Sequence, residues 1–593
     1  MTAHTFYSTN NQFSYKSYFF SLHFSRMNTS RLDHLPVELA HHLLGYFSAH
    51  EIFYSFANVT SYIDAVLATY TNYRVNFKAI SRNNFDLVCR YIIPDQVIAL
   101  TLSDDEDTPG LIGLFLSQFQ IHQFTRLQAL TLFEIGPDFW TNIIAQIVSL
   151  KYLRSFLYYP SNRSEPWICN LSPNEVTQLD KSLFSVYAPI LPQLSRLRLC
   201  HGDYLGSTLF PCLRHLVLER STINLINHIS SVAPHLKSLD TSFTFHSFQT
   251  ESIHPLPQLN HLVLRVEGKN LKVENISIVL PSLGTWISMN WIEHMMTNLP
   301  RLRHLELIAD GIDDIISGQR WERSARNLCT LKFNFYIRYP VEVQDLGSFQ
   351  TPFWIKDKRW FVAFSNERFF SVPHYMTTKV DGDFQFPQYT TVPDLEIFYR
   401  HLDTLVWTEI SRYPTNRFLQ VRTLILRSNT SLSGIRKVVD LCLIKHLSIS
   451  VPEKHWSIQS LLDQMPNLSQ LSIVGYIANF IKQVSPLSLN KIQTLSIRTL
   501  CLDHNEYNME PLCDILPNVR HLHINHPCSA EQIFQFLRQF KYLATASFYI
   551  ADWNANNVPE SRLYIQSSID QMRRTHALNF TSRCDGKRVF FWI

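Results

Sequence analysis

The sequence is poor in glycine and in charged residues, and it has no long apolar run. Only 15 of its 593 residues are glycine, and only 17% are charged. It contains no G-x-x-x-x-G-K-S/T, G-x-S-x-G or H-E-x-x-H motif, so the common nucleotide, esterase and metalloprotease sites are excluded. No apolar run is long enough to span a bilayer, and residues 1–30 lack the features of a secretory signal peptide. We therefore expect a non-catalytic, soluble protein of the cytoplasm or nucleus that needs no cofactor and binds no membrane.

Charge and cysteine patterns exclude two further classes of site. The formal net charge is +4 with Lys and Arg scattered along the chain, whereas a nucleic-acid-binding face concentrates its cations. We therefore expect no nucleic acid as a partner. The 10 cysteines include no C-x-x-C pair. One cluster, His521, His523, His526 and Cys528, has the side chains of a zinc site, but Pro527 and the lack of a second ligand pair argue against a metal there.

A nine-residue sequence motif, which we call the phrase, recurs along most of the chain. In Met465–Ile473 it places Leu468, Leu471 and Ile473 in an L-x-x-L-x-L pattern, with a proline two residues ahead of the first leucine. The same phrase occurs at Leu191–Leu199, Phe210–Leu218, Leu256–Leu264, Leu299–Leu307 and Leu516–Ile524. Its first apolar position falls at Val421, Ile444, Leu468, Ile492 and Val519, in steps of 23, 24, 24 and 27 residues. A fixed phrase at a steady period indicates a solenoid, in which each unit buries its apolar face against its neighbours.

The chemistry of the phrase predicts one strand per repeat. Its last two apolar side chains alternate inward on a short strand, and the residues before them point to the opposite face. The proline cannot continue a helix, and helical patterns such as Ile477–Val484 lie between the phrases. Phrase and period resemble the leucine-rich repeat, whose units are about 20–29 residues long. The resemblance implies an α/β horseshoe with parallel strands on the concave face and helices outside, over residues 73–339 and 406–593, the second run ending in a C-terminal cap.

Residues 340–405 break this period and are rich in aromatic side chains, among them Trp354 and Trp360. The segments Trp360–Phe364 and Phe369–Tyr375 flank a short polar stretch, which predicts a β-hairpin. Such an insertion can lie over one face of a solenoid and serve as a binding element. Alternatively, its rings pack on the solenoid, and we favour packing for most of them because aromatic side chains chiefly form cores.

The sequence pattern of residues 31–72 predicts three short helices. Pro36 opens the first helix, where its missing N–H costs nothing. Ser48 and Glu51 fit a capping box at the start of the second, which carries Ile52, Phe53, Phe56 and Val59. A third helix carries Ile63, Val66 and Leu67. This unit is too small to build a large core, so we expect a partner or the adjoining repeats to stabilise it.

The same stretch resembles an F-box. The residues that carry the resemblance are Leu35, Pro36, Glu38 and Leu39, then Leu43, Leu44 and Phe47, then Glu51, Ile52 and Val59. The family's Cys or Ser and its Trp after the valine are replaced by Thr60, Ser61 and Tyr62. The resemblance implies that Leu35, Pro36, Glu38, Leu39, Leu43, Leu44, Phe47 and Ile52 bind the Skp-type adaptor of a cullin–RING ubiquitin ligase. The alternative is a helical cap that only covers the end of the solenoid.

Five histidines occupy the same position of the phrase. His215, His261, His304, His446 and His521 each directly precede the second apolar residue, a position that is expected on the concave face. They form either a partner-binding stripe whose charge responds to pH near neutrality or a set of polar residues tolerated on a solvated strand face. With His523, Trp354 and Trp360 they are the candidate substrate-binding residues.

Together these features favour a substrate-recognition subunit of an SCF-type ubiquitin ligase. The resemblance implies that residues 31–72 bind the adaptor, which links the chain to the cullin, and that the repeats bind a protein substrate whose identity the sequence does not give. Ubiquitin transfer would then be carried out by partner subunits. The rival interpretation is a protein-binding scaffold without any ligase. Residues 1–30, rich in Ser, Tyr, Phe and Asn, are expected to be a disordered extension.

Overall fold

The structure is a computed structural model. The structure describes residues 33–159, 191–201, 205, 209–244, 253–267, 286–337, 346–365, 367–381, 387–407, 418–427, 434–451, 458–475, 477–482, 484–485, 489–498, 510–550, 567, 569–571, 574, 580–585 and 588–593. The extension predicted for residues 1–30 lies outside these ranges. The chain divides into two compact units at the Arg196–Leu197 bond, which falls within the first predicted run of repeats.

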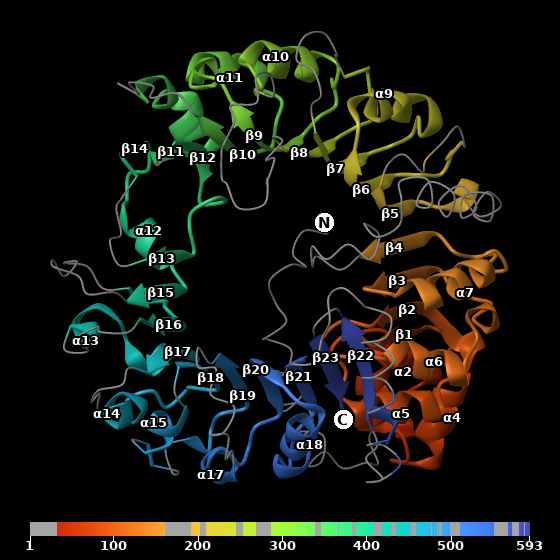
Figure 1. The fold of residues 1–593 in the computed structure, drawn as a ribbon. Helices are drawn as coiled ribbons and strands as arrows, with labels where there is room; N and C mark the ends of the chain where they lie inside the picture. The colour runs from red at the N-terminus through yellow and green to blue at the C-terminus, as the bar shows by residue number, and fades with distance from the viewer. Residues whose placement is uncertain are drawn as a thin grey trace. The chain divides into compact units, whose positions relative to one another are not determined.

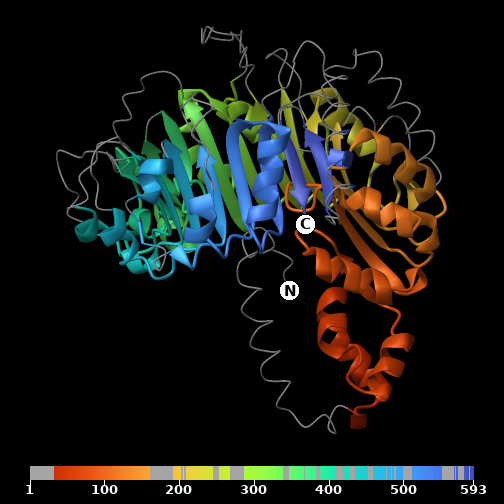
Figure 2. The ribbon, with the colours of Figure 1, turned by 60° about the horizontal axis from the view of Figure 1, so that its bottom comes forward.

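The first unit begins with the three predicted helices, α2 (Val37–Leu44), α3 (Ala49–Phe56) and α4 (Ser61–Thr69), drawn in red in Figure 2. We call residues 33–70 the helical unit. Pro36 directly precedes α2, and Ser48 with Glu51 forms the predicted capping box, in which the Ser48 N–H donates to Glu51 Oε2 at 2.8 Å. Thr60 caps α4 by accepting the N–H of Ile63 at 3.2 Å. Polar side chains at the helix starts thus satisfy backbone groups that the helices leave unpaired.

Strands and helices then alternate through the rest of the first unit. The order is β1 (Tyr73–Asn76), α5 (Arg82–Tyr91), β2 (Val97–Ser103), α6 (Leu111–Gln118), β3 (Ala129–Phe133), α7 (Pro137–Ile147) and β4 (Ser155–Tyr159). The four strands pair in parallel in chain order. The repeats therefore begin at β1, although this strand buries Tyr73 and Val75 and lacks the leucine phrase.

The second unit contains two runs of parallel strands. The first is β5 (Arg196–His201), β6 (His215–Ser221), β7 (Ser238–Thr244), β8 (His261–Glu267), β9 (His304–Gly311) and β10 (Thr330–Ile337). Helices α9 (Ile223–Val232), α10 (Met289–Thr297) and α11 (Gly318–Ser324) lie on one side of these strands (Figure 1). We call the opposite side of the strands the open face.

The second run continues the same alternation. Its strands are β13 (Lys379–Asp381), β15 (Thr404–Trp407), β16 (Thr423–Leu426), β17 (His446–Val451), β18 (Gln470–Gly475), β19 (Thr494–Arg498), β20 (His521–Cys528) and β21 (Thr545–Ile550). Helices α12 (Glu396–Arg400), α13 (Ile435–Val438), α14 (Ile458–Leu462), α15 (Ile477–Ile481), α17 (Glu510–Ile515) and α18 (Ala530–Gln539) connect them. Strands β22 (Thr581–Asp585) and β23 (Arg588–Trp592) end the sheet in antiparallel pairing.

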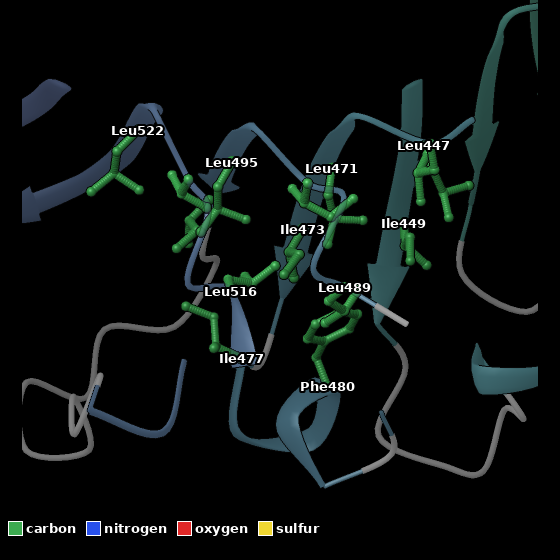
Figure 3. Close-up of a cluster of buried hydrophobic side chains, with 14 of the residues drawn as sticks. Leu447, Ile449, Leu471, Ile473, Ile477, Phe480, Leu489, Leu495, Leu516 and Leu522 are labelled. Carbon is green, nitrogen blue, oxygen red and sulfur yellow. The ribbon is translucent and has the colours of Figure 1, made fainter. Parts of the chain in front are cut away.

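The leucines of the phrase form the core between strands and helices. Leu447, Leu471, Leu495 and Leu522 lie in register on four neighbouring strands, and all are at most 1% exposed. Figure 3 shows them above Phe480 of α15 and the isoleucines of the next inward position. Full burial of one such side chain stabilises the fold by roughly 1.5–3 kcal/mol. The predicted α/β fold with long sheets of parallel strands is therefore confirmed, and it is consistent with a solenoid. No helix among the described residues has the length and apolar character that crossing a membrane requires.

The insertion forms the predicted hairpin. Strands β11 (Phe361–Ser365) and β12 (Arg368–Val372) pair antiparallel, with β14 (Tyr389–Thr390) beside β11. Strand β12 also pairs antiparallel with β10, so the hairpin extends the first sheet instead of lying across a face. The segments before it, Gly347–Phe349 and the π-helical turn Phe353–Lys358, pack on α11.

Candidate functional site

Helix α2 is apolar on two sides. Ala40 and Leu44 are buried, at 5% and 4% exposure, and face the rest of the helical unit. On the other side, Leu39 is 56% exposed, Leu43 is half-buried and Tyr46, just beyond the helix end, is 74% exposed. The spacing of i, i+4 and i+7 places these three residues along one stripe of the helix. We call Leu39, Leu43 and Tyr46 the α2 stripe.

Hydrogen bonds to α4 fix the orientation of α2. The Tyr62 hydroxyl donates to the Leu35 carbonyl, and the Thr60 hydroxyl donates to Asp33 Oδ1 at 2.7 Å. Nε2 of His41 lies 3.2 Å from the Val66 carbonyl oxygen. Residues that depart from the F-box pattern, Thr60 and Tyr62, thus anchor the start of the first helix. Consequently the α2 stripe is held facing away from the helical core.

The predicted adaptor-binding residues fall into three groups by their exposure. Pro36, Glu38 and Leu39 are exposed, while Leu35, Leu43 and Phe47 are half-buried. Two assignments are wrong, because Leu44 and Ile52 are 4% and 0% exposed and form the core of the helical unit. An apolar helix pattern does not by itself separate residues of a small core from residues of a docking surface. The sequence did not point to Tyr46 and Tyr54, which are 74% and 68% exposed, although Tyr46 could have been found at i+7 from Leu39. Val59, which was predicted on the second helix, lies beyond its end at Phe56 and is 40% exposed.

Helix α3 joins the helical unit to the first repeat. The Phe53 ring stacks on Tyr91 of α5, with centroids 5.5 Å apart, and lies 5.1 Å from the ring of Tyr73 in β1. Ile52, Phe53 and Phe56 are all buried. The helical unit therefore covers the end of the repeats through α3, while the α2 stripe stays exposed.

The predicted histidines lie on the open face but not in one unbroken column. His215, Ser238, His261, His304 and Thr330 occupy equivalent positions on β6–β10, so only His261 and His304 are adjacent. Their ring centroids are 5.8 Å apart. In the second run, Gln470 and Thr494 separate His446 from His521.

Most of these imidazoles are hydrogen-bonded to a hydroxyl on a neighbouring strand. The pairs, with their N–O distances, are His261–Ser238 at 3.0 Å, His304–Thr330 at 2.9 Å, His446–Ser472 at 2.9 Å, His521–Thr545 at 2.8 Å and His523–Ser547 at 2.9 Å. Burial lowers the pKa of His446, and the charge of Arg498 lowers it further. Burial and then the charge of Arg520 lower the pKa of His521 in the same way.

These pKa shifts predict that acid destabilises the second unit. A histidine whose folded-state pKa lies below its unfolded value of about 6.5 binds its proton more tightly in the unfolded chain. Its contribution to stability is therefore present above about pH 6.5 and is lost as the pH falls through the folded-state pKa. We expect a His446→Gln/His521→Gln variant to lose less unfolding free energy than the parent between pH 7.5 and 5.5 in urea titrations.

The exposed His235 offers the matched control for this prediction. A His235→Gln variant makes the same chemical change at an exposed position, and so measures the effect of the substitution itself. If the unfolding free energies of the parent and of the His446→Gln/His521→Gln variant have equal slopes against pH, these two imidazoles do not cause the loss of stability in acid.

The insertion places His374 and Tyr375 beside charged residues of the open face. Arg265 pairs with Asp240, and Lys332 Nζ lies 3.8 Å from Glu306 Oε2. Burial first, then the charge of Glu306, raises the pKa of Tyr375. Burial and then Lys332 lower the pKa of the neighbouring His374. Residues just after β12 therefore lie against the charged positions of β8–β10, while the hairpin itself extends the sheet.

Packing explains most of the aromatic side chains of the insertion, as the second interpretation predicted. Trp354 is 0% exposed and its Nε1 donates to the Gly318 carbonyl at 3.2 Å. Its assignment to a substrate-binding face is therefore wrong, because the packing of the insertion on α11 buries the whole ring. Trp360 is half-buried, with Lys358 Nζ 5.1 Å from its ring centroid, and so remains accessible on one side.

Among the described residues, no group of three or more His, Cys, Asp and Glu side chains is arranged to hold a metal ion. In the cluster considered above, His521 and His523 instead contact hydroxyls of β21. Burial raises the pKa of the Cys528 thiol to about 12.

Comparison with known proteins adds little. No family model and no curated protein matches the chain. One matching solved structure is described as "Structure of the Toll - Spatzle complex, a molecular hub in Drosophila development and innate immunity", with 12% sequence identity and a TM-score of 0.17. The match covers 72% of this chain and 52% of that chain, so it spans about half the length of its counterpart.

Proposed function

We propose that this protein is the substrate-recognition subunit of an SCF-type cullin–RING ubiquitin ligase. The helical unit binds the Skp-type adaptor, and the repeats, which we infer to be leucine-rich repeats in a horseshoe, bind a protein substrate on their concave face. One observation carries the proposal: α2 buries Ala40 and Leu44 but exposes Leu39 and Tyr46 on its other side. An exposed apolar stripe on a well-anchored helix is a typical protein-binding surface.

The geometry of the stripe fits a helical partner. Residues at i, i+4 and i+7 of one helix are the usual anchors when a helix lies in an apolar groove of another protein. Glu38 and Pro36, both exposed beside Leu39, would form the rim of that contact. In this arrangement the chain performs no bond chemistry. It contributes proximity, holding the substrate near the ubiquitin-loaded partner.

A Leu39→Glu variant tests the proposal. The complex would lose the roughly 1.5–3 kcal/mol of binding free energy that burial of the Leu39 side chain contributes. The new carboxylate would also lose its hydration in the interface, which weakens binding further. We expect the dissociation constant for the purified adaptor to rise about 100-fold, measured by isothermal titration calorimetry with the full chain. The thermal unfolding midpoint should stay unchanged, because the side chain is exposed.

The control is Leu209→Glu, which changes a leucine of similar exposure, 63%, in the second unit. This variant should bind the adaptor like the parent. Adaptor binding that Leu39→Glu leaves intact would contradict the role of the α2 stripe.

The scaffold without a ligase remains the second candidate, and α3 favours it. Through Phe53, α3 already covers Tyr73 and Tyr91 of the first repeat, as a terminal cap must. The two candidates differ in the calorimetric experiment with the parent chain. A folded chain that shows no heat of binding with the adaptor would leave the cap as the function of the helical unit.

A further inference from the structure

The backbone hydrogen bonding of the second unit is interrupted at the insertion. Strands β5 to β10 continue through β12 and β11 to β14 in one sheet, whereas β13 and β15 to β23 belong to another. Within each sheet, neighbouring strands share a ladder of hydrogen bonds, as β10 does with β9 along its whole length. Between described residues, no strand pair and no other backbone hydrogen bond joins the two sheets. The ladder that stiffens a stack of repeats is therefore missing at this place.

The chain itself crosses between the two sheets three times. It passes from β12 to β13, returns from β13 to β14, and then leads through α12 into β15. We call the connecting segments 373–378 and 391–403 the joint. No ion pair between described residues links the repeats before the joint to those after it. The covalent crossings keep the two parts together, but they do not fix the angle between them.

Two separate apolar clusters meet at α12. The core of the second run includes Tyr399 of this helix, whose ring centroid lies 5.4 Å from that of Phe418. The adjacent Phe398 belongs to a small cluster on the insertion. The other members of that cluster are Ala363, Phe370, Val372, Met376 and Val392. The two buried side chains of α12 are thus anchored in different cores, one on each side of the joint.

Bending at α12 disrupts less structure than bending between two ordinary repeats. At β17, β18 and β19, a change of angle would break a hydrogen-bonded ladder and open a continuous core. At the joint, the same change requires the side chains of one small cluster to slide against each other, which is how packed helices accommodate small domain movements. Helix α12 is therefore the weakest connection between neighbouring strands of the second unit.

We propose that the second unit bends at the joint, with the repeats before it and the repeats after it moving as two rigid parts. The hairpin β11–β12 moves with the first part, because β12 pairs with β10. Bending changes the distance between the open faces of the two runs. A partner that contacts both runs would bind one angle more tightly and so select it. The bend belongs to the chain alone, so it does not depend on the proposed function.

Native cysteines provide label positions for the test. Cys329 precedes β10 and Cys442 precedes β17, so this pair spans the joint, while Cys212 lies before β6 in the first run; all three are exposed. Two forms of the full chain each keep one pair, Cys329 with Cys442 or Cys212 with Cys329, and have serine at the other cysteines. Both carry nitroxide labels for distance measurement by double electron–electron resonance.

We expect the distance distribution of the pair that spans the joint to be at least about twice as wide as that of the pair within the first run. Equal widths would overturn the proposal, because the second unit would then behave as one rigid stack. Since this comparison involves no adaptor, its outcome is independent of the calorimetric test of the ligase proposal.

Phe398→Ala should widen the distribution across the joint about 1.5-fold further, because it removes the anchor of α12 in the insertion cluster. Phe480→Ala is the matched control, since it removes the same side chain, fully buried, from α15 in the second run. Phe398→Leu, which keeps most of the apolar volume, should restore the parent's width. Equal widening by Phe398→Ala and Phe480→Ala would contradict the role of α12, as would widening of the Cys212/Cys329 distribution by Phe398→Ala.

Discussion

Replacing Gly318 by alanine is expected to lower the unfolding free energy of the second unit by roughly 2–4 kcal/mol. A Cβ atom at this position would lie 2.2 Å from the carbonyl oxygen and 2.5 Å from the carbonyl carbon of Ser348. Both are backbone atoms, so no rotamer change can relieve the contact. The cause is this close approach of two chain segments, which only a residue without a side chain permits.

Gly318 has this effect because it lies where α11 meets the insertion. Its N–H donates to Ser348 Oγ at 3.0 Å, and its carbonyl accepts from Trp354 Nε1 at 3.2 Å. A shift of the Gly347–Phe349 turn would disturb Trp354, which is fully buried 4.8 Å from the Phe349 ring centroid. Tryptophan fluorescence during urea unfolding, to which Trp354 and the other tryptophans contribute, therefore measures the loss of stability.

Gly311→Ala is the matched control for Gly318→Ala. Its Cβ would approach the terminal Cδ1 of Ile315 at 2.6 Å, and this end of a flexible side chain can move at a cost of about 0.5–1.5 kcal/mol. The comparison separates backbone collision from crowding in general. If the two variants unfold at the same urea concentration, the packing of the insertion on α11 is not what stabilises this region.

Where the sequence repeats, the structure could be predicted in detail. Leu468, Leu471 and Ile473 are all at most 1% exposed, as their alternation required, because a strand points successive side chains to opposite faces. The first run of repeats was predicted from residue 73, but the phrase itself does not mark the strand that lies there. Strand β1 buries Tyr73 and Val75 in place of leucines, and a phrase defined by leucine does not detect it. The same inward positions are filled, but by side chains of another shape.

Features that depend on distant parts of the chain could not be predicted. The hairpin β11–β12 followed from its two apolar segments, but its pairing with β10 brings together Phe335 and Phe369, which local sequence does not encode. Trp354 was assigned to a surface because an irregular segment has no period from which burial can be derived. In the helical unit, the same apolar composition serves both the core at Ile52 and the exposed position at Leu39, and only the packing separates them.

Replacing Leu471 by alanine is expected to lower the unfolding free energy by roughly 2–5 kcal/mol, the range for deleting a buried leucine side chain. Leu471 is 1% exposed and lies between Leu447 and Leu495 on the adjacent strands (Figure 3). In a solenoid each repeat contacts only its neighbours, so the cavity should loosen β17 and β19 together with β18. Hydrogen exchange should therefore accelerate in these three strands and stay unchanged in β6–β9.

A substitution of the neighbouring Ser472 tests whether only one face of β18 is packed as a core, as the alternation of side chains along the strand requires. Its hydroxyl lies on the open face, 2.9 Å from His446 Nε2, and a Ser472→Ala variant should lose only about 1 kcal/mol or less, the net value of one hydrogen bond. A loss as large as that of Leu471→Ala would mean that the open face is packed like a core. A small loss would leave that face free to bind a partner, because its side chains contribute little to the stability of the repeats that hold them.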